Sequence, residues 1–204
     1  MDILTAVGLA APAGLNAYLA LLIVGLAARF TSLIKLGEPY NILTNTWVLL
    51  LLGVLLAVEV FADKIAVVDS INDLIGTVVR PAAGAILSLA STQQVGLDPV
   101  LAGALGLVLA GSVHGLKATS RPMITATTGG LANPFVSMIE DVLAAAGVIL
   151  TLLAPIVGVI LVVLLIVMMV GLAITVRRLV RRAVRWNLGR GRSPDPSSGG
   201  VASG

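Results

Sequence analysis

An almost uninterrupted apolar run from Val142 to Val176 constrains this chain more than any other feature. As one helix, rising 1.5 Å per residue, the run would be about 52 Å long, whereas the hydrocarbon core of a bilayer is about 30 Å thick. One crossing cannot use all of it. We therefore expect two membrane helices joined by a tight turn at Ala154-Pro155, because proline interrupts the hydrogen bonding of a helix.

The composition of the whole chain agrees with a lipid environment. Hydrophobic residues make up 58% of the sequence and charged residues 11%, with a mean hydropathy of +1.07. A soluble domain of this length has too much surface for that balance. The absence of cysteine excludes a disulfide framework, a thiolate metal site and a cysteine nucleophile, and the single histidine, His114, excludes a multi-histidine metal site. We expect no metal and no cofactor.

The apolar segments predict an all-α fold, a polytopic bundle of about six transmembrane helices over residues 1–180. A basic and then disordered cytoplasmic tail is expected over residues 181–204, because the Ser- and Pro-rich end has nothing to bury. The third span is interrupted by Arg80-Pro81. The six spans are expected at Ala13–Phe30, Thr46–Ala62, Leu74–Ser91, Val100–Leu116, Phe135–Leu153 and Ile156–Val176.

The placement of lysine and arginine predicts the orientation. Cytoplasmic loops carry an excess of these residues, and residues 177–204 alone hold seven of the 13 in the chain. We expect a multi-pass protein of the bacterial inner membrane with both termini in the cytoplasm. The inner loops then hold Lys64, Lys117 and Arg121, and the outer loops hold only Arg29 and Lys35.

The arginine cluster Arg177–Arg192 directly follows the last apolar helix. A cluster in that position favours contact with anionic lipid headgroups and gives no reason to expect nucleic acid. The lipid bilayer is therefore the first expected partner. Association with a second copy of the chain or with another membrane protein is left open.

A parallel internal repeat is a further hypothesis. Leu55–Lys64 can be laid on Val108–Lys117, and Ser70–Leu74 on Met138–Val142. Each copy would be a helix ending in lysine, then a loop, then a helix beginning with acidic residues, and both copies would run the same way through the membrane. The alternative is chance similarity between apolar segments.

Several polar motifs in this apolar chain resemble one known family. They are Gly14-Leu-Asn-Ala-Tyr18, Glu59-Val-Phe-Ala-Asp-Lys64 with Val68-Asp69-Ser70, Arg80-Pro81, His114-Gly-Leu-Lys117 with Arg121, and Asn133 through Glu140-Asp141. Over most of residues 8–155 the chain is similar to the bacterial membrane proteins grouped as domain of unknown function 4126. The resemblance implies a membrane protein and supplies no activity.

The charged residues within the predicted bundle are the candidate site. A charge at the bilayer centre costs about 3 kcal/mol or more, so such groups usually pair or line a cavity. Glu59 is expected to be buried against a base, Lys117 or Arg121. The alternative is that the charges only flank short helices at the interface. The candidate substrate- or ion-binding residues are Asn16, Glu59, Asp63, Lys64, Asp69, Asp73, Arg80, His114, Lys117, Arg121, Asn133, Glu140 and Asp141.

Two segments favour irregular backbone inside the membrane. Asn16 follows Ala11-Pro12-Ala13-Gly14, where proline and glycine can break a helix and free carbonyls near a buried amide; an interhelical hydrogen bond is the simpler reading. Ala118–Pro134 is rich in hydroxyls and glycine, which suits either a re-entrant loop lining a cavity or a flexible cytoplasmic loop. It matches no phosphate-binding loop.

Three classes of function compete for this sequence. The buried charges favour a small secondary transporter or channel-like permease. The rival is a membrane scaffold or accessory subunit, whose charges would be structural ion pairs and whose arginine tail would bind lipid or a partner. A membrane enzyme is disfavoured because the chain has no nucleophile elbow, zinc motif or phosphate-transfer signature.

Overall fold

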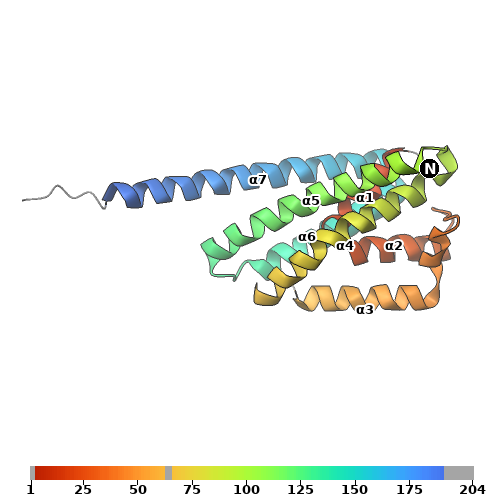
Figure 1. Cartoon of the computed structure of the whole chain (residues 1–204), viewed down its shortest axis with the longest axis horizontal. Coiled ribbons are helices and arrows are strands. Elements are labelled where there is room, and N and C mark those ends of the chain that lie inside the picture. The colour runs from red at the N-terminus through yellow and green to blue at the C-terminus, as the bar shows by residue number, and fades with distance from the viewer. Residues whose placement is uncertain (1–2, 63–65, 191–204) are drawn as a thin grey trace, which may run out of the picture.

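The computed structural model describes residues 3–62 and 66–190, and in this part of the chain every regular element is a helix (Figure 1). The all-α prediction is confirmed. There are seven α-helices in the described ranges instead of about six, with two short 3-10 helices between them. Their bounds are α1 Ile3–Ala13, α2 Ala17–Phe30, η1 Tyr40–Thr44, α3 Thr46–Ala62, α4 Ala66–Thr92, η2 Gln93–Val95, α5 Pro99–Thr128, α6 Asn133–Leu153 and α7 Pro155–Arg190.

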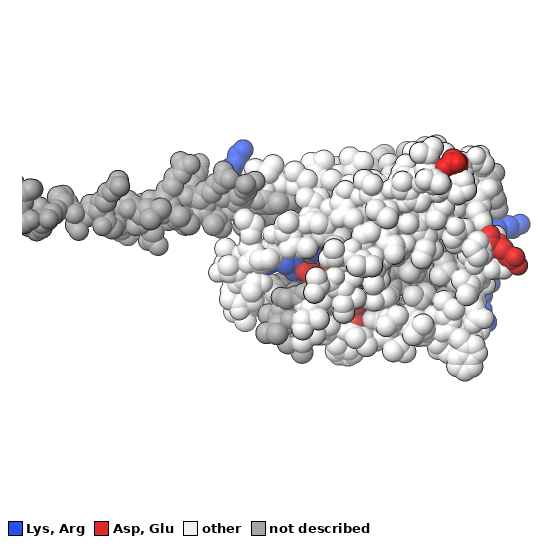
Figure 2. Space-filling view, in the orientation of Figure 1, with Lys and Arg blue, Asp and Glu red and all other residues white. Residues whose placement is uncertain are grey.

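The distribution of side chains is the reverse of that in a soluble protein. Trp47 is 79% exposed and Leu131 81%, whereas Arg80 is 1% and Lys117 0% exposed. The flank seen in Figure 2 is almost free of charge, apart from the right-hand end, the base of the projecting arm and two small spots, one of basic and acidic atoms and one of acidic atoms. Of the described helices, α4 (from Ile71), α5 and α6 are long and apolar enough to span a membrane. The outer surface therefore suits lipid, and the interior holds the charges.

Helices α1 and α2 form a hairpin that enters the bundle and returns to the same end (Figure 1). Gly8 lies against Thr151, whereas Pro12, further along α1, lies against Gly147. Helix α1 thus runs antiparallel to α6. Helix α2 then runs back towards the start of α3. There Arg29, in the last turn of α2, donates to the carbonyl of Thr44 and to the hydroxyl of Thr46. The hairpin is re-entrant, because neither of its helices crosses the bundle.

This hairpin corrects the predicted topology. The expected span Ala13–Phe30 is wrong: α2 has 14 residues, about 21 Å of helix, and begins inside the bundle. Consequently Ile3 lies at the same end as the 31–45 segment, whereas α7 runs to the opposite end (Figure 1). The two ends of the described chain thus lie at opposite ends of the bundle, whereas the sequence led us to expect both termini on one side of the membrane.

Segment Ala118–Thr128 is helical, so both readings of it as a loop are wrong. Its hydroxyl groups are satisfied within α5, because each donates to the carbonyl one turn earlier: Thr125 to Arg121 at 3.0 Å and Thr128 to Ile124 at 2.7 Å. The helix ends at Thr128, and the next residue, Gly129, has a φ of 62°, a conformation that glycine adopts without strain. The polar composition therefore extends α5 and leaves only a short turn before α6.

Glycine sets the closest contact between two crossing helices. Gly84 of α4 packs directly on Ala110 and on the carbonyl of Gly106 in α5, leaving no room for a side chain at position 84. This close approach brings the polar faces of α4 and α5 together, as small residues do at membrane helix interfaces.

The predicted turn at Ala154-Pro155 is confirmed, since α6 ends at Leu153 and α7 begins at Pro155. Helix α7 has 36 residues, about 54 Å of helix, and projects well beyond the other helices (Figure 1). Helices α3 and α5 run one way and α4 and α6 run back, as a parallel repeat requires. The repeat itself stays a prediction.

Candidate functional site

Four helices and the tip of the α1–α2 hairpin bring most of the predicted residues into buried ionic contacts. Two groups can be distinguished. The Arg80 group is formed by Glu59, Asp73, Thr77, Arg80 and His114, and the Glu140 group by the carbonyl of Leu15 with Asn16, Lys117, Arg121, Glu140 and Asp141. Helix α5 contributes to both groups, because His114, Lys117 and Arg121 lie on one stripe at i, i+3 and i+7.

Arg80 is the centre of the first group. Its Nη2 donates to Oε1 of Glu59 at 2.8 Å, and its Nη1 donates to Oδ1 of Asp73 at 3.2 Å. Both Arg80 and Glu59 are almost completely buried. The predicted burial of Glu59 is therefore confirmed, but the predicted partner is corrected: the base that it binds is Arg80, whereas Lys117 and Arg121 bind Glu140.

His114 lies between Arg80 and Thr77. Nη1 of Arg80 is 2.8 Å from Nδ1 of His114, and arginine has only donors, so Nδ1 must accept. The ring is then neutral with its proton on Nε2, which faces the hydroxyl oxygen of Thr77 at 3.3 Å. Thr77 in turn donates to the carbonyl of Asp73 at 3.0 Å. This tautomer is assigned from the hydrogen bonds around the ring.

Glu140 is the centre of the second group. Its Oε2 accepts from Nζ of Lys117 at 3.0 Å and from Nη2 of Arg121 at 2.7 Å. Lys117 also donates to the main-chain carbonyl of Leu15 at 3.1 Å. That carbonyl lies in the break between α1 and α2, where it has no place in a helical ladder. The ammonium group thus satisfies backbone that the broken helix frees.

Asn16 connects the hairpin tip to α6. Its side-chain oxygen accepts from the N–H of Leu19 at 2.9 Å, which caps the N-terminus of α2. Its amide nitrogen donates to Oδ1 of Asp141 at 2.9 Å. The break predicted at Ala11–Gly14 and the interhelical hydrogen bond, which were alternatives for the sequence, occur together.

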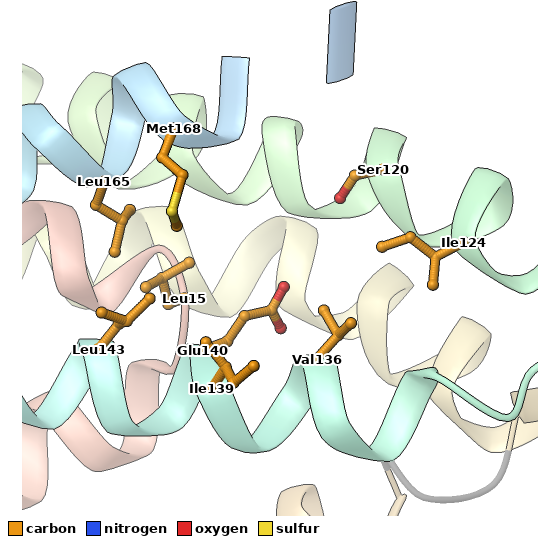
Figure 3. Close-up of a pocket in the computed structure, with 9 residues that line it drawn as sticks. All are labelled: Leu15, Ser120, Ile124, Val136, Ile139, Glu140, Leu143, Leu165 and Met168. Carbon is orange, nitrogen blue, oxygen red and sulfur yellow. The ribbon is translucent and has the colours of Figure 1, made fainter. Parts of the chain in front are cut away.

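Two pockets lie on different sides of α6, each next to one of its adjacent acids. The first, of about 260 Å³, lies between α5, α6 and α7, and Figure 3 shows the carboxylate of Glu140 directed into it. The second, of about 190 Å³, lies between the end of α3 and the start of α6 and is lined by Ser137 and Asp141. The Glu140 group therefore borders space on both sides.

The remaining predicted residues have other positions. Asn133 is buried, but its described partner is the hydroxyl of Thr125 at 2.9 Å, so it closes the turn between α5 and α6 and is not among the ionic contacts. Asp63 and Lys64 lie outside the described residues, and so does the side chain of Asp69.

Sequence reasoning missed Thr77 and the carbonyl of Leu15. A signal for Thr77 was present, because Asp73, Thr77 and Arg80 recur at spacings of four and three, which places them on one face of a helix. No side-chain pattern marks a carbonyl. Within residues 3–62 and 66–190, no group of three His, Cys, Asp or Glu side chains is placed to hold a metal ion. The described side chains are acids and bases that compensate one another's charge.

Comparison with known proteins gives a family and no activity. No curated protein and no solved structure matches the chain. The model of one family, described as a domain of unknown function, matches residues 3–174 and so covers the hairpin, both ionic groups and both pockets. The chain therefore belongs to the family DUF4126.

Proposed function

We propose that this protein is a small secondary transporter or permease whose polar site is formed by the Arg80 and Glu140 groups. The observation that carries the proposal is the re-entrant hairpin, which brings the Leu15 carbonyl and the Asn16 amide to charged side chains of the crossing helices. Broken helices that end at buried polar groups are a common way to build a transport site. The proposal includes no catalytic chemistry.

The energetics support a role beyond stability. Replacing a buried ion pair by well-packed apolar residues is often neutral or stabilising, so a fold has little need of such pairs for its own sake. Here Glu59, Arg80, Lys117, Arg121 and Glu140 are all at most 6% exposed. Adjacent pockets at Glu140 and Asp141 provide space through which a solute can reach the charges from two sides of α6.

A proton-linked step is part of the proposal. A protonated His114 has no acceptor, so protonation at Nδ1 would break its contact with Nη1 of Arg80. Arg80 would then keep its ion pairs with Glu59 and Asp73, while Lys117 lies one turn further along α5. Because protonation of the ring would remove this contact and place a second positive charge beside the Arg80 guanidinium, the contact is a suitable coupling element.

The natural setting is included in the proposal. We place the protein in the inner membrane of a bacterium, with the arginine-rich end of α7 in the cytoplasm, because cytoplasmic ends collect lysine and arginine. The segment Arg177–Arg192 would bind anionic headgroups there. On this orientation the hairpin enters from the outer side.

Cysteine accessibility tests for a water-filled site without knowledge of the solute, since the chain has no cysteine of its own. Ser137→Cys places a thiol in the pocket beside Asp141, and Ser112→Cys places one on the exposed outer face of α5. In sealed vesicles a membrane-impermeant thiol reagent should label Ser137→Cys and leave Ser112→Cys unlabelled. Labelling should change with pH, and His114→Gln should abolish that change. Equal protection of both thiols would favour the scaffold.

A flux measurement tests transport itself. Purified protein in liposomes that contain a pH-sensitive dye is challenged with ion and solute gradients. We expect proton movement that Glu59→Gln abolishes. If no gradient moves protons or solute, and Glu59→Gln leaves thermal stability unchanged, the buried charges are neither a transport site nor a structural necessity, and the proposal fails.

A further inference from the structure

The pocket at Glu140 is lined mainly by apolar side chains, as a binding site for an aliphatic chain is. Its walls are the apolar side chains of Ile124, Leu143, Leu165 and Met168 from three helices (Figure 3). At its edge Ile139 is 57% and Met168 56% exposed, so the pocket opens on the flank of the bundle that suits lipid. A ligand would enter it sideways from the bilayer.

The polar atoms of this pocket are hydrogen-bond acceptors only. Of its lining residues, Ser120 and Glu140 are polar. Among the described contacts Oε2 of Glu140 is bound by Lys117 and Arg121, which leaves Oε1 for a ligand. The Ser120 hydroxyl donates to the carbonyl of Lys117 at 2.9 Å, so it can only accept a hydrogen bond from a ligand. A ligand that binds in this pocket must therefore supply a hydrogen-bond donor.

The charge around the pocket favours a neutral head. Two bases, Lys117 and Arg121, bind Oε2 of Glu140, whereas Asp141 lies beside the second pocket on another side of α6. An ammonium head would face these two bases, and a carboxylate head would bring no donor for Oε1, while burial of either charge costs solvation. A hydroxyl group supplies the donor without a charge.

We propose that the pocket between α5, α6 and α7 binds a neutral amphiphile, an aliphatic chain with a hydroxyl head that donates to Oε1 of Glu140. The source is either a free long-chain alcohol or a glycerolipid with a free hydroxyl group. As a substrate class this deepens the proposed function and rests on it. The binding itself does not require transport.

The test uses the full chain in phosphatidylcholine nanodiscs, whose lipid has no hydroxyl or amine donor. Added 1-decanol should raise the midpoint of thermal unfolding by about 3–6 °C at a tenfold excess over the dissociation constant. Decyl methyl ether, which has the same chain without the donor, should give no comparable shift. For a lipid source, diacylglycerol, which has a free hydroxyl group, should raise the midpoint, whereas triacylglycerol, which has none, should not.

Paired variants locate the effect. Met168→Trp fills the mouth of the pocket and should abolish the shift, whereas Ile160→Trp, at a position 54% exposed on the same helix, should retain it. A photoreactive diazirine derivative of decanol should label peptides that contain Leu143 or Met168. An equal shift with the ether, an undiminished shift in Met168→Trp, or labelling elsewhere would overturn the inference. If binding fails while Ser137→Cys labelling and proton flux persist, the substrate class is wrong and the transport proposal stands.

Discussion

The ammonium group of Lys117 donates to the main-chain carbonyl of Leu15 at 3.1 Å, across 102 residues of sequence. The same ammonium group binds Glu140 at 3.0 Å. One side chain of a crossing helix thus holds both the tip of the re-entrant hairpin and the acidic face of α6. Loss of this contact should loosen the hairpin and the site together.

Lys117→Met should cost about 3–5 kcal/mol of unfolding free energy, because it leaves the buried Glu140 with one base fewer and the Leu15 carbonyl without its donor. The exposed Lys35→Met removes the same charge with little effect. Unfolding in mixed micelles with increasing denaturing detergent measures both. Similar stability of the two variants would contradict the described contacts.

Glu59→Gln should also cost about 3–5 kcal/mol, because Arg80 then loses the more buried of its two described acidic partners. Glu38→Gln, at an exposed position near the cis Glu38-Pro39 bond, is the matched control and should change stability by less than about 0.5 kcal/mol. The same unfolding assay applies. Exchanging the two charges, Glu59→Arg with Arg80→Glu, should restore part of the stability but not proton flux, since the field of the site is reversed.

Asn16 should matter more than an ordinary helix cap. Asn16→Ala removes both the cap of α2 and the bond to Asp141, an expected loss of about 2–5 kcal/mol. Asp98 caps α5 through the N–H groups of Val100 and Leu101, at the surface, so Asp98→Ala should cost about 1 kcal/mol. Asn16→Asp keeps the cap but sets a second carboxylate against Asp141. It should be no more stable than Asn16→Ala if the bond is real.

The re-entrant hairpin makes a prediction about sidedness. A reporter fused before Ile3 and one inserted at Ser32 should report the same side of the membrane, and one fused after Arg190 the other side. Pairs of reporters that function on one side only provide the measurement. An N-terminal fusion that agrees with the C-terminal fusion would restore a crossing first helix and contradict the hairpin.

The arginine cluster should bind membranes through charge. A peptide of Arg177–Arg192 should bind vesicles that contain anionic lipid, with each basic residue contributing about 1 kcal/mol near the surface. Added salt should weaken the binding, because the Debye length shortens to about 3 Å at 1 M. Equally strong binding to neutral vesicles would show that the apolar side chains dominate.

Much of the site was predictable because polar groups are conspicuous in an apolar chain. Glu59, Arg80, Lys117, Arg121 and Glu140 are buried together as the cost of charge in lipid requires. Their pairing was not predictable, since Arg80 and Lys117 can each reach more than one acid. The choice depends on the crossing of α4 and α5, which the small residues at Gly84 and Gly106 determine.

The topology was less predictable than the helices themselves. An apolar segment shows that a helix meets lipid or a packed interior, but it does not show whether the chain leaves by the far side. The pair Pro12 and Asn16 indicated a break, yet the return of α2 depends on contacts with α6. The hydroxyl-rich composition of Ala118–Thr128 resembles that of a loop. Composition does not reveal that these hydroxyls donate to carbonyls of their own helix, which leaves the helix intact.

The hairpin has a consequence for the order of biosynthesis. Helix α1 packs chiefly against α4, α5, α6 and α7, and none of these has been made when α1 leaves the ribosome. Helix α1 is therefore made before these packing partners and reaches its final contacts only as the later helices are added. A chain truncated before Pro155 would keep α3 to α6 but leave α1 without its contacts to α7, so completion of the hairpin's packing depends on the helix that lies farthest from it in sequence.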